Sequence, residues 1–230
     1  MTSLSSHALF HYTHTFSALK CILQKGLRFG IIGERIPGNP LIYITRSISL
    51  CSIPLSQISE HADWYGHYAI GVKPSFIKKN GGTPVIYVHT SSPYIPHSYG
   101  TGNLKMFESS PMTPFLKQIC GKQRKYNCVK AFNKNYYDEK EWRIIDKSVP
   151  VSVFPYADYT DIKQIVADFK QSAEYSYLVI PLEDIEYILV ETKTEIKELV
   201  CYLKELKYDS SDIEMILPKV ITYYGTMQDI

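Results

Sequence analysis

Residues 10–27, FHYTHTFSALKCILQKGL, predict a polar, aromatic strand that leads into a short amphipathic helix. Apolar side chains recur at helical spacing between Thr15 and Lys25, namely Phe16, Leu19, Ile22 and Leu23. Gly26 suits a left-handed helix C-cap, and Lys25 suits the last turn. The end of the strand therefore places a histidine, His11, and the hydroxyl of Thr13 near the N-terminal end of the helix.

Composition and charge indicate an ordinary globular chain. Its 230 residues are 45% hydrophobic and 21% charged, with a formal net charge of +2, so no basic field demands nucleic acid. The five cysteines form no C-x-x-C pair, which indicates neither a zinc site nor a disulfide framework. No secretory leader or apolar span of membrane length is recognised, and we expect a cytoplasmic protein.

Strand and helix patterns alternate along the whole chain without an internal repeat or a linker. Strands are expected at 41–53, 67–72, 84–89, 127–132 and 141–146, and near the C-terminus within YLVI, EYILVE and KVITYY. Helices are expected after Pro54 and at 15–25, 74–80, 113–122, 158–171, 194–206 and 212–217. A long loop is expected at 90–110. The fold class that follows is α+β: a single domain, residues 1–230, with a split, mixed or antiparallel β-sheet flanked by helices.

Two segments before residue 70 carry candidate ligand-binding groups. The imidazole of His11 could hydrogen-bond a ribose hydroxyl, or could be a structural histidine bonded to backbone. Gly66 would let a ligand approach the backbone, and Tyr68, two residues later on the same strand face, could stack on a flat ring. The alternative is a β-bulge with core aromatics.

A third candidate segment, Glu139-Lys140-Glu141-Trp142-Arg143, begins a strand. Alternation places Glu139, Glu141 and Arg143 on one face. A carboxylate there could orient a ribose hydroxyl and stabilise oxocarbenium character at the adjoining carbon. The alternative is a solvated Glu141–Arg143 pair.

A basic run is the remaining local feature. It consists of Lys117, Lys122, Arg124, Lys125, Lys130 and Lys134. A solvated helix and loop is the simpler interpretation, and a nucleic-acid interface is the weaker one. The histidines lack acidic neighbours at ligand spacing, so no metal site is predicted.

The ordered motifs of the chain resemble the AbiGi family of abortive phage-resistance proteins. The resemblance is carried by the segments 9–13 (LFHYT), 65–71 (YGHYAIG), 80–87 (NGGTPVIY), 137–143 (YDEKEWR), 184–188 (DIEYI) and 218–222 (PKVIT). It implies one component of a two-gene defence module, often an antitoxin, whose partner is a protein encoded in the same module or a protein target.

A more distant resemblance is to the His–Tyr–Glu ADP-ribosyltransferases. It implies an ADP-ribosyltransferase-like fold with NAD as the substrate. Its cofactor-binding residues would be His11, Tyr12, Thr13, Gly66 and Tyr68. Glu141 would be the catalytic glutamate, with Glu139 as the extra glutamate of the Glu-x-Glu form.

Two functions therefore remain open. The first is an NAD-dependent ADP-ribosyltransferase that acts in phage defence. The second is a non-enzymatic antitoxin or regulator that binds a partner protein or a nucleotide. Tyr12, which stands where the transferase motif has a small glycine, favours the second.

Overall fold

The computed structural model describes residues 6–96, 101–155, 166–169 and 174–228, and their central element is a nine-stranded sheet. Its main path runs β15 (Val220–Thr222), β14 (Ile185–Val190), β5 (Tyr68–Val72), β1 (Leu9–Thr13), β4 (Leu41–Cys51), β11 (Glu141–Ile145) and β6 (Thr83–Pro84); β3 (Gly30–Arg35) and β12 (Ser152–Pro155) pair with β4 as well. Neighbouring strands are antiparallel except for the parallel pair β14–β15. This confirms the predicted α+β class with a mixed, mainly antiparallel sheet.

Three two-stranded sheets and seven α-helices lie entirely within the described residues, which also include helical residues 166–169. The small sheets pair β2 (Leu27–Arg28) with β13 (Tyr177–Leu178), β7 (Ile86–Val88) with β8 (Leu116–Gln118), and β9 (Cys120–Arg124) with β10 (Ala131–Asn135). The helices are α1 (Phe16–Lys25), α2 (Ser59–Tyr65), α3 (Pro74–Lys79), α4 (Thr101–Ser109), α6 (Lys193–Glu205), α7 (Ser210–Ile216) and α8 (Tyr223–Gln228). None of these described helices has the length and apolarity needed to cross a bilayer.

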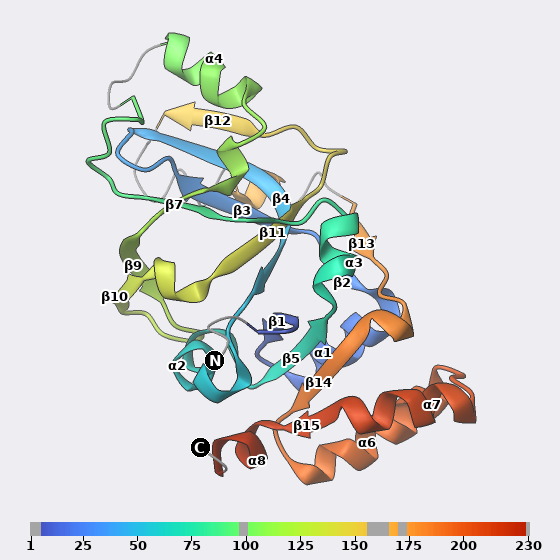
Figure 1. Cartoon of the computed structure of the whole chain (residues 1–230). Helices are drawn as coiled ribbons and strands as arrows, with labels where there is room; N and C mark the ends of the chain where they lie inside the picture. Colours follow the sequence, from blue (N-terminus) through green and yellow to red (C-terminus); the bar gives the residue numbers. More distant parts are fainter. Residues whose placement is uncertain (1–5, 97–100, 156–165, 170–173, 229–230) are drawn as a thin grey trace.

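Strand β4 organises the sheet because it has different neighbours along its length. Its first half pairs with β12, its second half pairs with β11, and β3 spans residues 42–47. Strand β1 is registered with β4 through the single pair Phe10↔Cys51. The sheet is therefore split between β1 and β4, while β1 stays paired with β5 along its whole length (Figure 1).

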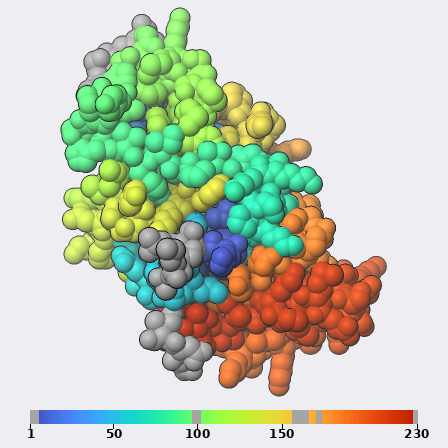
Figure 2. Space-filling view, viewed as in Figure 1, coloured from blue at the N-terminus to red at the C-terminus, as the bar shows by residue number. Residues whose placement is uncertain are grey.

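The helices cover both faces of the sheet. A large apolar cluster on one face joins Leu9, Ile70 and Ile144 to side chains of α1, α3, α6 and α7. A smaller cluster on the other face joins Phe10 and Cys51 to α2 and α8. The C-terminal helices form one end of the molecule and the segment around α4 forms the other, as Figure 2 shows.

Helix α1 follows its local sequence signals closely. The Thr15 hydroxyl accepts a hydrogen bond from the Ala18 amide at 3.2 Å, and Leu19, Ile22 and Leu23 are buried. Gly26 has a φ of 96°, and a Cβ built there would lie 2.3 Å from the carbonyl oxygen of Leu178. Gly26 therefore caps this helix as predicted and has a positive φ, but its ψ of −177° is not that of a left-handed helical residue.

Three local predictions are wrong. The expected helix at 113–122 is a 3₁₀ turn, Thr113–Phe115, followed by β8 and β9, since pairing with β7 and β10 overrides helical propensity. The expected loop at 90–110 contains α4, which buries Phe107. The expected strand at 84–89 is divided into β6 and β7 with Val85 between them, and Ile86 at the start of β7 is 40% exposed.

The remaining predicted elements that lie within the described residues agree with the prediction to within a few residues. The strand expected at 127–132 is β10, displaced to Ala131–Asn135. The expected strand KVITYY ends at Thr222, where α8 begins. The helix expected at 158–171 falls mostly outside the described residues, which include only 166–169 of it.

Candidate functional site

The candidate site begins at the N-terminal end of β11, where a carboxylate and a guanidinium share one sheet face. Glu141 aligns with Cys51 of β4, and Arg143 aligns with Ser49. Arg143 Nε lies 2.7 Å from Glu141 Oε1, and both side chains are buried. Alternation predicted the shared face correctly. The alternative prediction, a solvated Glu141–Arg143 pair, is wrong because Arg143 is only 1% exposed.

Glu139 joins this pair through two lysines from other elements. Lys117 on β8 places its Nζ 2.7 Å from Glu139 Oε2 and 2.6 Å from Glu141 Oε2. Lys134 on β10 lies 2.7 Å from Glu139 Oε1. Tyr65 at the end of α2 donates a short hydrogen bond to the same oxygen. Both carboxylates are therefore neutralised by buried cations.

The network extends to β3 and β4 through the Arg143 guanidinium. Its Nη2 lies 2.7 Å from Glu34 Oε1, and its Nη1 donates to the Tyr43 hydroxyl at 2.6 Å. Tyr43 donates in turn to Glu34 Oε2 at 2.9 Å. Glu34 and Tyr43 are directly aligned neighbours in the β3–β4 ladder, so the strand register itself creates this contact.

Electrostatics favour the ionised forms of Glu139, Glu141 and Lys117, whereas burial lowers the pKa of Lys134. Burial alone would raise the pKa of Glu141, but Arg143 and Lys117 hold it at about 2. Burial likewise opposes ionisation of Glu139, and Lys117 and Lys134 lower its pKa. Burial would also lower the pKa of Lys117, yet the carboxylates around it raise that pKa well above its usual range. The arrangement stabilises permanent charges rather than a proton-exchanging pair.

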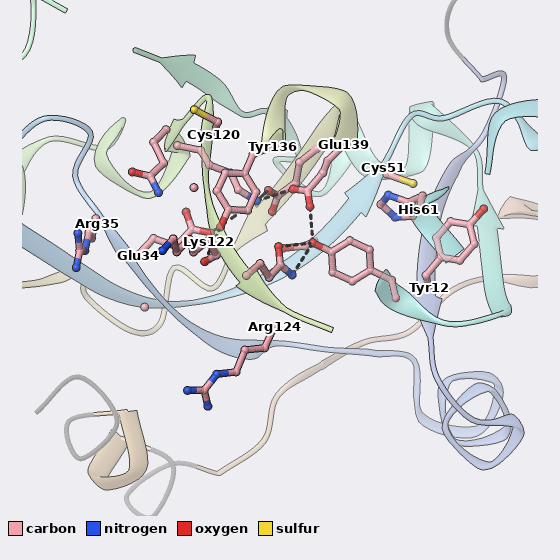
Figure 3. A pocket seen from close by; sticks show the side chains of 18 of the residues that line it. Tyr12, Glu34, Arg35, Cys51, His61, Cys120, Lys122, Arg124, Tyr136 and Glu139 are labelled. Carbon is pink, nitrogen blue, oxygen red and sulfur yellow. Dashed lines mark hydrogen bonds and ion pairs between the residues drawn. The ribbon is translucent and has the colours of Figure 1, made fainter. Parts of the chain in front are cut away.

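A cavity of about 940 Å³ lies between this network, the sheet face that carries Phe10 and Cys51, and the β9–β10 hairpin (Figure 3). Glu139, Glu141 and Lys117 line its polar part. Further lining residues are Phe10, His11, Tyr12, Glu34, Arg35, Ile42, Leu50, Cys51, His61, Tyr65, Gln118, Cys120, Lys122, Gln123, Arg124 and Tyr136. Size and composition are those of a small-molecule site.

One end of the cavity is aromatic and uncharged. The His61 ring lies 5.0 Å from the Tyr12 ring and 4.6 Å from the Tyr65 ring, measured between centroids. Burial lowers the pKa of His61 to about 4, so its imidazole is neutral at pH 7. Burial raises the pKa of Cys51 to about 12, so this thiol is protonated and is not a ready nucleophile.

The structure brings four of the predicted site residues to this cavity. They are His11, Tyr12, Glu139 and Glu141. His11 Nδ1 is 2.8 Å from the Ser49 carbonyl oxygen, beside the split between β1 and β4, and burial lowers its pKa. His11 therefore makes the hydrogen bond to backbone that was the structural alternative for this histidine. The Tyr12 hydroxyl is buried and finds no hydrogen-bond partner among the described residues.

The other three predicted residues lie elsewhere. Tyr68 is on the opposite face of the sheet, where its hydroxyl donates to Glu195 at 2.7 Å and to Glu191 at 3.0 Å. Thr13 pairs with Tyr68 and shares that face. Gly66 caps α2 with a φ of 99°, and a Cβ there would lie 2.2 Å from the Thr13 carbonyl oxygen. Gly66 therefore serves a close backbone contact, and the residues present do not fit a nicotinamide held between Tyr68 and Glu141.

The network contains partners that sequence reasoning missed, namely Glu34, Tyr43, Tyr65 and the buried roles of Lys117 and Lys134. The prediction of a solvated helix and loop for the basic run is wrong for Lys117 and Lys134, which are each less than 10% exposed. In the sequence, Lys122 and Arg124 alternate with the uncharged residues Gly121 and Gln123, and this alternation was a signal for strand β9. Nothing local indicated that Glu34 would contact a residue more than a hundred positions away.

Comparison with known proteins identifies the family. A search of curated proteins and a search of solved structures gave no significant match. The family model described as "Putative abortive phage resistance protein AbiGi, antitoxin" matches residues 44–218, which is most of the chain and includes β4 from Ile44 onward, the β9–β10 hairpin and the whole of β11. The chain therefore belongs to the AbiGi family and is a component of an abortive phage-resistance system.

Proposed function

We propose that this chain is the antitoxin of a two-protein defence module and that it acts by binding its partner protein without catalysis. The observation that carries the proposal is the state of Glu139 and Glu141. All four of their carboxylate oxygens contact a cation, namely Lys117, Lys134 or Arg143, within 2.7 Å. A carboxylate that stabilises an oxocarbenium ion acts through its negative charge, and these charges are compensated.

The turn of the β9–β10 hairpin, residues 125–130, is the surface best suited to the partner. Tyr126 is 56% exposed and Val129 is 86% exposed, which is unusual for large apolar side chains. Lys130 follows Val129 and adds positive charge to these apolar anchors, while Lys125 at the other side of the turn is paired with Asp63 at 3.3 Å. The partner protein would present an acidic surface with an apolar recess.

The test is a binding titration with the purified partner protein from the same module. We expect Val129→Asp to weaken the complex by about tenfold or more, because it places a carboxylate where an apolar anchor is buried on binding. The matched control is Val179→Asp, since Val179 is 70% exposed and lies near the unrelated strand β13. No complex with the wild-type chain would refute the proposed function. Equal affinity of the two variants would refute only the hairpin surface.

A second candidate, an NAD-dependent ADP-ribosyltransferase, draws support from the cavity shared by His11, Tyr12, Glu139 and Glu141. Its test is nicotinamide release from NAD, measured with and without the partner protein. Release above a protein-free blank that is lost in folded Glu141→Gln would establish the enzyme. A rate equal to the blank in both conditions would exclude it.

A further inference from the structure

The cavity has a chemical polarity that neither the family nor the proposed function explains. Tyr12, His61 and Cys51 lie at one end, and Arg35 and Lys122 lie toward the other, with Arg124 on the adjoining hairpin strand (Figure 3). The first group consists of two aromatic rings and a thiol, all uncharged at pH 7. The second group is basic.

The polar floor between the two ends contributes no excess negative charge. Its three carboxylates, Glu34, Glu139 and Glu141, are compensated by Lys117, Lys134 and Arg143 through ion pairs of 2.6–2.7 Å. Lys122, an exposed lysine of β9, then adds positive charge to the lining. The field in the cavity therefore favours an anionic ligand over a cationic one.

The aromatic end is suited to a flat heterocycle. The rings of Tyr12, His61 and Tyr65 are neighbours at 5.0 and 4.6 Å and offer surface for stacking. The neutral imidazole of His61 makes no hydrogen bond within the described residues, and it supplies one donor and one acceptor. A donor and an acceptor on one ring can form hydrogen bonds with the edge of a nucleobase.

We propose that this cavity binds a nucleotide, with the base against His61 and Tyr65 and the phosphate near Lys122 and Arg124. The volume of about 940 Å³ accommodates a ligand of that size. The hairpin contributes Gln123, Lys122 and Arg124 to the cavity and also carries the exposed turn at 125–130. Bound nucleotide would thus contact the element proposed to meet the partner protein.

The test is calorimetric titration of the full chain with AMP, GMP, CMP and UMP, with the matching nucleosides, and with inorganic phosphate, at one ionic strength. We expect at least one nucleotide to bind with a Kd below about 1 mM, and its nucleoside and phosphate to bind about tenfold more weakly. No binding at about 5 mM nucleotide would overturn the proposal. Phosphate binding as tight as nucleotide binding would also overturn it, because only an anion patch would remain.

Two variants locate the site. Lys122→Gln should weaken nucleotide binding about fivefold or more and leave nucleoside binding unchanged, since it removes a phosphate partner. Lys130→Gln, another exposed lysine of the same hairpin outside the cavity, is the control and should bind as the wild type does. Equal nucleotide affinity of the two variants would place the ligand elsewhere. The assay contains no partner protein, so its failure leaves the proposed antitoxin function standing.

Discussion

Tyr68 and Glu141 lie on opposite faces of the central sheet. The aligned residues Gly71, Phe10, Cys51 and Glu141 run across four strands on one face. Tyr68, three positions from Gly71 on β5, points to the other face and packs in the cluster with α1 and α6. A ligand that contacts the Glu141 side of the sheet therefore has no access to the Tyr68 ring.

This separation predicts that Tyr68 is irrelevant to any ligand of the cavity. In Tyr68→Leu, we expect the change in melting temperature caused by NAD to equal that of the wild type, because the ring lies across the sheet from the site. Thermal unfolding with and without NAD measures it. A ligand-induced shift that disappears in this variant would restore the nicotinamide role of Tyr68.

The ion network predicts a large loss of stability when one charge is removed. Glu141→Gln leaves Arg143 and Lys117 buried with less negative charge nearby, and we expect a loss of about 3–5 kcal/mol in the free energy of unfolding. Urea denaturation measures the change. The control is Glu198→Gln on the exposed side of α6, which should change stability by about 0.5 kcal/mol or less. Equal stabilities of the two variants would show that the network is not stabilising.

Because His61 is neutral in the folded protein, we predict that the free energy of unfolding begins to depend on pH above the range in which carboxylates titrate. Its pKa falls from 6.5 to about 4 on folding, so the unfolded chain binds the proton more tightly. Stability should therefore decrease as pH falls from 6.5 to about 4, by up to about 3 kcal/mol. Urea denaturation of the wild type and of His61→Gln, at several pH values, measures it. The variant should show a flatter profile in this window, and parallel profiles would contradict the assignment.

The depressed pKa of Glu141 has its effect at lower pH. The folded value of about 2 lies below the ordinary 4.5, so the stabilisation is complete above pH 4.5 and is lost as pH falls toward 2. We expect acid unfolding within this interval in His61→Gln, where the contribution of His61 is absent. Circular dichroism during acid titration monitors it. A variant that stays folded at pH 2 would contradict the expected loss.

The two glycines Gly66 and Gly102 predict opposite effects of the same substitution. Gly66→Ala should destabilise by about 2 kcal/mol or more, because φ is 99° and the new methyl group would meet the backbone of Thr13 and His14. Gly102→Ala in α4 should be neutral or stabilising by up to about 1 kcal/mol, because no atom lies within 4 Å. Melting temperatures of the two variants give the comparison, and a similar loss in both would refute it.

Local signals account for what the sequence could predict. The hydroxyl of Thr15 and the glycine at position 26 mark the ends of α1 because capping involves near neighbours in the chain. Alternation likewise placed Glu141 and Arg143 on one face. Their burial could not be predicted, because it depends on Lys117 and Glu34, which reach the site from β8 and β3.

Strand register was the decisive information that the sequence lacked. The motifs of Tyr68 and Glu141 were predicted in adjoining parts of one pocket. The face of each strand follows from its pairing, and a shift of one residue exchanges the two faces. The register Phe10↔Gly71 and Phe10↔Cys51 assigns Tyr68 and Glu141 to different faces.

The balanced set of Glu34, Glu139, Glu141, Lys117, Lys134 and Arg143 constrains how relatives of this chain can diverge. Loss of one charge leaves an uncompensated ion in the interior, so a single substitution in this set is a disfavoured first step. Exchange is tolerable when an acid and its basic partner are replaced together by uncharged residues of similar volume. We expect these six positions to covary in acid–base pairs among AbiGi proteins, and the surface residues of the hairpin turn to vary independently of them.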